Sequence, residues 1–95
     1  MMWIKDENRI LYNGEHIWKI DAIPYVTNMS GDVNVHEFVA YRNDDMLILA
    51  RVHATIPEAY AVLDEIAREI KHGKELIDIP EIIRAITGIT EEDFG

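Results

Sequence analysis

The stretch Met46–His53, MLILARVH, constrains the fold of this chain most strongly, because its first five side chains are all apolar. Neighbouring side chains of a β-strand point to opposite faces, so a strand with one face in water alternates apolar and polar residues. This stretch does not alternate before Arg51. We therefore expect a strand with apolar side chains on both faces, each of which needs cover.

A second apolar stretch, Val33–Tyr41, precedes this run and is joined to it by the turn formers Arg42–Asp45. If Tyr41 lies opposite Met46 in an antiparallel hairpin, the side chains divide between two faces. One face holds Val35, Val39, Tyr41, Met46, Ile48, Ala50 and Val52. The other face holds His36, Phe38, Ala40, Leu47, Leu49, Arg51 and His53. A shift of one residue in the loop would exchange these partners.

The residues before this hairpin also predict strands. The dipeptide Asn13-Gly14 tolerates the positive backbone angles of a tight type I′ turn. We therefore expect Arg9–Tyr12 and Glu15–Trp18 to pair as a hairpin. Further along, Pro24 indicates an edge strand or a bend, since proline cannot donate a hydrogen bond to a neighbouring strand.

The second half of the chain predicts two helices. Thr55–Glu58, TIPE, is typical of a helix start, because its threonine and glutamate form a capping box and its proline occupies the first turn. Apolar side chains then recur at helical spacing up to Gly73, where the helix is expected to end. They are Ile56, Ala59, Tyr60, Leu63, Ile66, Ala67 and Ile70. A similar start, Asp78–Glu81, predicts a shorter helix that ends at Gly88.

Strands followed by helices predict an α+β domain. We expect an N-terminal antiparallel sheet of about four to five strands, then a long amphipathic helix and a shorter C-terminal helix. A chain of 95 residues supports one core, so residues 1–95 are expected to form a single domain. The polar residues 27–32 are expected to form a loop, and the acidic residues 90–95 to fray.

One amphipathic helix covers only one face of a small sheet, which leaves Phe38, Leu47 and Leu49 on the other. Burial of each such side chain contributes about 1.5–3 kcal/mol, a large amount against a domain stability of about 5–15 kcal/mol. Either the second helix, Pro80–Thr87, or a partner chain should cover them. The connector Gly73–Asp78 is short for carrying the chain around a sheet, so we expect a homodimer. The expected interface consists of Phe38, Leu47, Leu49 and Arg51.

Charge and composition limit the partners. Nine basic against eighteen acidic residues give a net charge of −9. This charge repels phosphate backbones and anionic lipids, so we expect neither nucleic acid nor a membrane as a direct partner. The chain has no cysteine and no apolar run near the roughly 18 residues of a membrane span. A cytoplasmic location is therefore expected.

Histidines are the natural candidates for catalysis or metal binding, and the chain has four. In the expected register His36 and His53 share a face with Arg51, close to Asn34, and no other polar constellation can be assembled. Two histidines lack the third ligand of a zinc site, and an adjacent arginine would repel the cation. We therefore expect no metal, no cofactor and no catalytic residue.

These observations lead to one main hypothesis and two alternatives. The main hypothesis is a small non-enzymatic protein-interaction or regulatory module that self-associates through the second sheet face. The first alternative is an acidic inhibitor, of the kind mobile elements carry, that docks on a basic surface of a nucleic-acid-processing enzyme. The second alternative is a small enzyme that uses His36 and His53.

Overall fold

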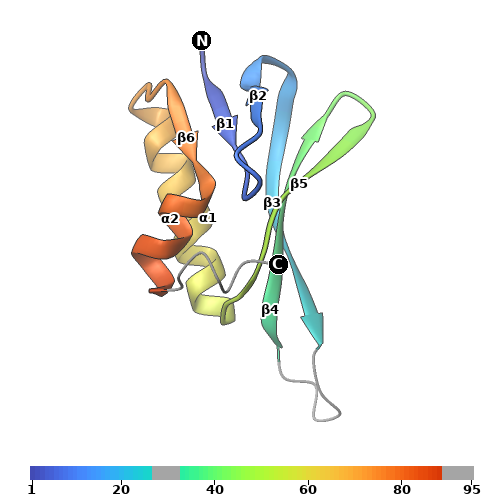
Figure 1. The fold of residues 1–95 in the computed structure, drawn as a ribbon, viewed down its shortest axis with the longest axis vertical. Helices are drawn as coiled ribbons and strands as arrows, with labels where there is room; N and C mark the ends of the chain where they lie inside the picture. Colours follow the sequence, from blue (N-terminus) through green and yellow to red (C-terminus); the bar gives the residue numbers. More distant parts are fainter. Residues whose placement is uncertain (27–32, 89–95) are drawn as a thin grey trace.

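A computed structural model describes residues 1–26 and 33–88 of the chain. The predicted loop at 27–32 and the predicted acidic tail at 90–95 lie outside the described residues. In chain order the elements are β1 (Trp3–Lys5), β2 (Leu11–Asn13), the short 3₁₀ helix η1 (Gly14–His16), β3 (Ile17–Val26), β4 (Val33–Arg42), β5 (Asp45–His53), α1 (Ile56–Lys71), β6 (Leu76–Asp78) and α2 (Ile79–Thr87). The predicted α+β class is confirmed (Figure 1).

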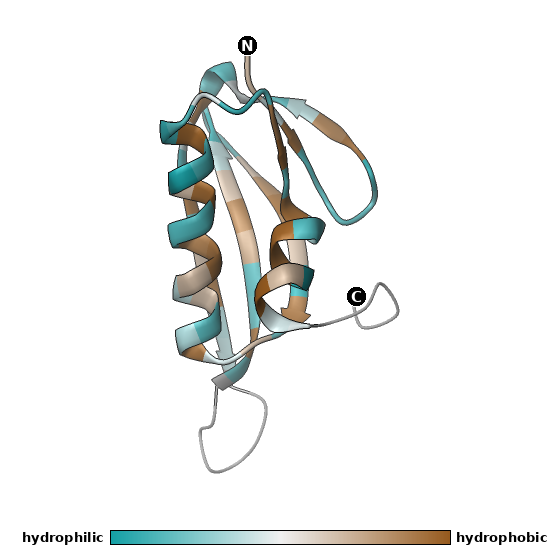
Figure 2. Cartoon of the chain, turned by 90° about the vertical axis from the view of Figure 1, so that its left-hand side faces the viewer, coloured by the Kyte–Doolittle hydropathy of each residue, from teal (hydrophilic) through white to brown (hydrophobic). Residues whose placement is uncertain are grey.

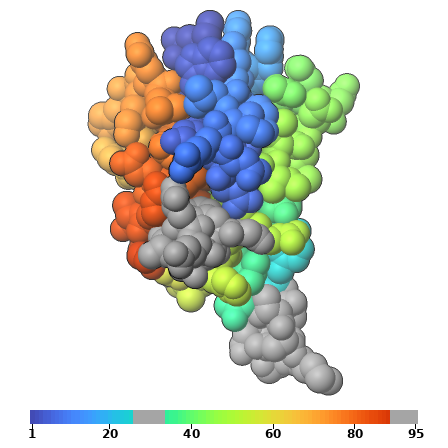
Figure 3. Space-filling view, in the orientation of Figure 1, coloured from blue at the N-terminus to red at the C-terminus, as the bar shows by residue number. Residues whose placement is uncertain are grey.

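The strands form two three-stranded sheets rather than one. The larger sheet has the order β3-β4-β5 and is antiparallel throughout. The smaller sheet has the order β2-β1-β6, in which β1 pairs antiparallel with β2 and parallel with β6. The predicted connector after α1 therefore contains a strand, because its residues Leu76–Asp78 form β6. Figure 3 shows the β1–β2 segment between the helices and β5.

The predicted hairpin around Asn13-Gly14 is wrong. β2 pairs with β1, and Asn13 has a φ of −68°, which a type I′ turn does not allow. Its side chain instead accepts a hydrogen bond from the Glu15 N–H at 2.9 Å and starts η1. Gly14 is needed for close packing, because a Cβ there would lie 3.1 Å from the Met2 carbonyl oxygen.

The predicted pairing of Tyr41 with Met46 is confirmed, but the register changes further along the hairpin. Val39 pairs with Ile48 and Phe38 pairs with Ala50, so Leu49 is an extra residue in β5. Such a bulge moves every following side chain of the strand to the opposite face. Ala50 and Val52 therefore join the face of Phe38, while Arg51 and His53 join the other face.

Both helices lie on the same face of the larger sheet, side by side (Figure 2). The core lies between the helices and the sheet, and Phe38 and Leu49 are fully buried in it. Their predicted place in a homodimer interface is therefore wrong, because this chain covers them itself. Leu47 is half-buried and packs against the same core. The prediction was wrong because Phe38 was assigned to the face that the long helix leaves uncovered, whereas α1 and α2 both lie on the face of Phe38.

The helix boundaries follow the sequence closely. Thr55 caps α1 with the full capping box, and Asp78 caps α2 by accepting the Glu81 N–H. α2 ends at Gly88, whose φ of 73° favours glycine. The core stripe of α1 differs from the prediction, since Ala59, Val62 and Ile66 are buried whereas others point to solvent. Those exposed at predicted core positions are Ile56, Tyr60, Ala67 and Ile70.

Within residues 1–26 and 33–88, no helix has the length and apolar character that crossing a membrane requires.

Candidate functional site: the outer sheet face

The face of the larger sheet that points away from the helices is the candidate site, and we call it the outer face. No described helix lies over it (Figure 1). The strand pairings assign side chains from all three strands to it. They are Lys19, Asp21, Ile23 and Tyr25 of β3, Val35, Glu37, Val39 and Tyr41 of β4, and Met46, Ile48, Arg51 and His53 of β5.

The end of the outer face near the β4–β5 turn is apolar and aromatic. The rings of Trp18 and Tyr41 lie 5.6 Å apart between centroids, and the ammonium of Lys19 lies 5.2 Å from the centroid of Tyr41. Beside them Met46 and Ile48 are 46% and 49% exposed. Such half-exposed large side chains are positioned by the sheet but still offer apolar area to a partner.

The other end of the outer face is organised around Arg51. Its Nη2 donates to Glu37 Oε2 at 3.1 Å and to the Tyr25 hydroxyl at 3.5 Å. The Tyr25 hydroxyl also donates to Glu37 Oε1 at 3.2 Å, and the guanidinium lies 5.0 Å from the centroid of the Tyr25 ring. Glu37 is buried although it is charged, and this pairing compensates for its lost hydration.

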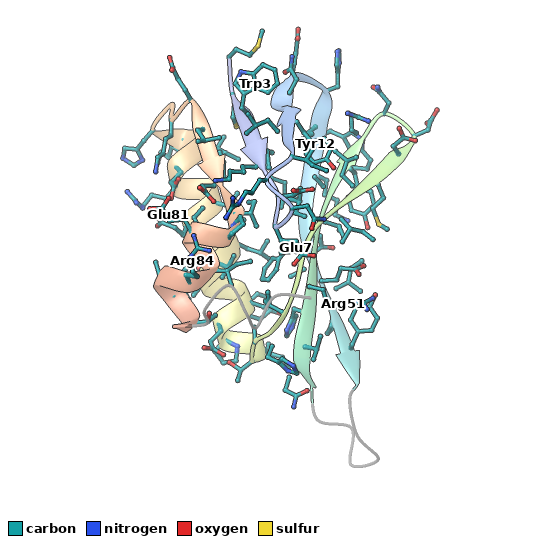
Figure 4. The ribbon with its side chains drawn as sticks, in the orientation of Figure 1. Trp3, Glu7, Tyr12, Arg51, Glu81 and Arg84 are labelled. Carbon is teal, nitrogen blue, oxygen red and sulfur yellow. The ribbon has the colours of Figure 1, made fainter. Side chains whose placement is uncertain are left out.

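Glu7, at the tip of the β1–β2 loop, closes the edge of β5 next to Arg51 (Figure 4). Its N–H donates to the Leu49 carbonyl at 2.8 Å, and its Oε2 accepts the Arg51 N–H at 3.4 Å. Partial burial raises the pKa of Glu7, with a smaller contribution from nearby Asp6. The bulge at Leu49 is therefore held from the second sheet.

Asp6 fixes the loop that carries Glu7. Its Oδ1 accepts the N–H groups of Asn8 and Ile10 at 2.8 and 2.9 Å, and its Oδ2 accepts the Tyr12 hydroxyl at 3.2 Å. The carboxylate is buried and its oxygens are satisfied. Asp6 is thus a structural residue, and burial beside its charge raises the pKa of Tyr12.

The charges of the outer face are paired with one another. Lys19 and Asp21 form an ion pair at 3.7 Å, and Arg51 pairs with Glu37. None of these groups is an unpaired acid, base or nucleophile positioned for catalysis. In the described part of the chain, no group of three histidine or acidic side chains is placed to hold a metal ion.

The sequence-predicted polar constellation does not come together. His36 is buried on the helix side, where its Nδ1 lies 2.9 Å from the Ala54 carbonyl oxygen. His53 is exposed on the outer face with Arg51. The carbonyl of Asn34 accepts the Ala54 N–H at 2.9 Å. The Leu49 bulge separates the two histidines, so they cannot act on one substrate atom.

Of the predicted interface, only Arg51 belongs to the outer face. The sequence did not place Tyr25, Glu37 and Trp18 at the candidate site, because it did not predict β3 as the neighbour of β4. It did place Tyr41, Met46 and Ile48 together on one face, and that grouping is the signal that could have identified this site.

Comparison with known proteins finds no family model, curated protein or solved structure that the chain matches. Its functional interpretation therefore depends on the geometry of the outer face.

Proposed function

We propose that this protein is a small non-enzymatic interaction module that self-associates through the outer face. The observation that supports this proposal is the exposed apolar surface of Met46 and Ile48 beside Tyr41, on a sheet face that no described helix covers (Figure 1). The ring of Trp18 lies against Tyr41 at the edge of this face. In the proposed homodimer two outer faces pack against each other and shield these side chains from water.

The residue types of the outer face fit a protein interface. The cores of such interfaces are enriched in tyrosine, tryptophan, methionine and arginine, and depleted in other charged residues. Arginine and aromatic residues also contribute most of the binding energy at many interfaces. Arg51 stacked on Tyr25 and the Trp18–Tyr41 pair provide such anchors at the two ends of the face.

Electrostatics favour this face over others for contact between two copies. Two chains of net charge −9 repel each other, so contact is least costly where charges cancel locally. On the outer face, Lys19 neutralises Asp21 and Arg51 neutralises Glu37. A twofold arrangement is self-complementary, and it can also bring Lys19 of one copy close to Asp21 of the other.

The size of the outer face predicts a weak dimer. Strands of nine to ten residues rise about 3.3 Å per residue and lie about 4.8 Å apart, so three of them span about 30 Å by about 14 Å. The projected area of about 400 Å² is half of the about 800 Å² that each partner buries in a stable complex. We expect a dissociation constant in the micromolar range.

Sedimentation equilibrium of the wild type and two variants tests the proposal. Ile48→Glu places a charge beside Met46 in the apolar part of the outer face and should leave a monomer at every concentration. Leu11→Glu is the matched control, because Leu11 is equally exposed but lies on the smaller sheet, and this variant should dimerise like the wild type. A monomeric wild type at high micromolar concentration, or equal effects of both variants, would contradict the proposal.

The acidic-inhibitor hypothesis remains an alternative that is supported by the net charge of −9. It predicts an affinity that falls steeply as ionic strength rises, whereas an apolar dimer interface should change little with salt. The enzyme hypothesis gains no support from the geometry, because His36 and His53 lie on opposite faces of the sheet.

A further inference from the structure

A groove of about 440 Å³ lies between α1 and α2, the two helices that pack on the other face of the larger sheet. Side chains at every third or fourth position of each helix line it. The apolar side chains that line the groove are Ala61 from α1 and Ile82, Ala85 and Ile86 from α2. Ala61 and Ala85 are exposed, so a partner side chain can approach the helix backbones there.

The charged lining of the groove is predominantly acidic. Five carboxylates and two cations line it: Asp64, Glu65, Glu69, Asp78 and Glu81 against Arg68 and Lys74. Arg68 is paired with Glu65, Lys74 with Glu69, and Asp78 with Lys5. Asp64 and Glu81 form no ion pair with any described residue, and they line the groove from opposite helices.

Glu69 adds a second, independent feature. Its side chain is 8% exposed, and among the described residues its Oε1 has no hydrogen-bond donor. The Lys74 ammonium lies 3.0 Å away, but outside hydrogen-bond geometry. The ion pair with Lys74 compensates this buried carboxylate in part, and a hydrogen-bond donor supplied by a ligand in the groove would add to it.

We propose that this groove binds a basic amphipathic helix of a partner protein. Its apolar side chains pack on Ala61, Ile82 and Ala85, and its lysine or arginine side chains pair with Asp64 and Glu81. Helix-in-groove binding of this kind needs an apolar floor and complementary charge, and this groove has both. The surface is separate from the outer face, so it can be occupied in the monomer and in the proposed dimer.

Fluorescence anisotropy with a synthetic peptide tests this proposal. The probe is a fluorescein-labelled peptide with leucine at helical core spacing and lysine at all other positions. A peptide of the same composition in scrambled order controls for charge alone. The ordered peptide should bind more tightly than the scrambled one, and Ala85→Arg, which fills the groove with a cation, should abolish this difference.

Charge variants assign the binding to the groove. The double variant Asp64→Asn/Glu81→Gln should lower the affinity about tenfold, because it removes two ion pairs. The matched double variant Glu15→Gln/Asp44→Asn removes the same charge at exposed positions outside the groove and should lower it less than about twofold. Equal losses in the two double variants, equal binding of the scrambled peptide, or no binding at all would overturn the proposal.

Discussion

At the scale of single residues, Leu49 determines which side chains form the outer face. As the extra residue of β5, it moves Arg51 and His53 away from the core and brings Ala50 and Val52 into it. The run Met46–Ala50 is apolar on both faces because Leu49 is a bulge residue. On either side of it, the side chains of β5 alternate between the two faces of the sheet. The Glu7 N–H donates to the Leu49 carbonyl and so helps to hold the bulge at this position.

Leu49→Ala should therefore destabilise the fold by about 2–5 kcal/mol, since it leaves a cavity in a fully buried site. Its neighbour provides the control: Ile48→Ala removes a half-exposed side chain and should cost less than about 1 kcal/mol. Urea unfolding at low protein concentration measures both values. Similar losses for the two variants would show that Leu49 does not lie in the core.

The lowered pKa of Glu65 predicts that the stability of the fold depends on pH. Hydrogen bonds from Arg68 are the largest cause that lowers the pKa of Glu65 from 4.5 to about 2. A carboxyl group whose pKa is lower in the folded state stabilises the fold above its unfolded pKa, and this contribution is lost as the pH falls through its folded pKa. The NMR titration of the Glu65 carboxyl carbon should have its midpoint near pH 2. Glu65→Gln should make the stability less sensitive to pH between about 4.5 and about 2, and a midpoint near 4.5 would contradict the assignment.

At the scale of secondary-structure elements, local signals determined most of what the sequence could predict. The capping residues Thr55 and Asp78 and the terminal Gly88 fixed both helices, because their chemistry acts within a few residues. The sequence did not predict which face of α1 is turned toward the core. Its apolar residues occupy two adjacent stripes, and only packing on the sheet selects the stripe that contains Val62.

Thr55→Ala should destabilise the protein by about 1 kcal/mol, because it removes the acceptor for the Glu58 N–H at the start of α1. Thr55→Ser keeps the acceptor and should behave like the wild type to within about 0.5 kcal/mol. Thermal and urea unfolding measure this difference. An unchanged stability of Thr55→Ala would mean that the capping box does not contribute.

The edge strand β3 carries features that oppose strand addition. Asp21 Oδ1 accepts the Ala22 N–H at 2.8 Å, and Pro24, two residues further on, has no N–H. Backbone groups two residues apart point to the same side of a strand, so both positions are blocked as donors to an added strand. This arrangement favours contact between sheet faces over contact between sheet edges.

The double variant Asp21→Val/Pro24→Val should therefore aggregate faster than the wild type, through pairing of exposed β3 edges. Light scattering and thioflavin T fluorescence measure this rate. Glu15→Val adds a similar apolar group outside the strand and should aggregate no faster than the wild type. Equal aggregation of the two variants would attribute the effect to added hydrophobicity.

At the scale of the whole molecule, the sequence predicted the fold class but not the arrangement of the sheets. The smaller sheet pairs Trp3–Lys5 with Leu76–Asp78, and no local pattern indicates a parallel pair so far apart in the chain. Through this pairing the predicted connector contains the strand β6. β6 leads directly into α2, which lies beside α1. The candidate interface was misplaced for the same reason: Phe38 and Leu49 were assigned to a second layer although two helices cover their face.

The proposed self-association through the outer face is tested most directly by an NMR concentration series. ¹H–¹⁵N spectra of the wild type are recorded from low to high micromolar concentration. We expect the amide signals of Tyr41, Met46, Ile48 and Arg51 to shift together along one binding curve, while signals of the exposed side of α1 stay unchanged. Spectra that do not change with concentration, or shifts confined to the helices, would contradict the proposed self-association.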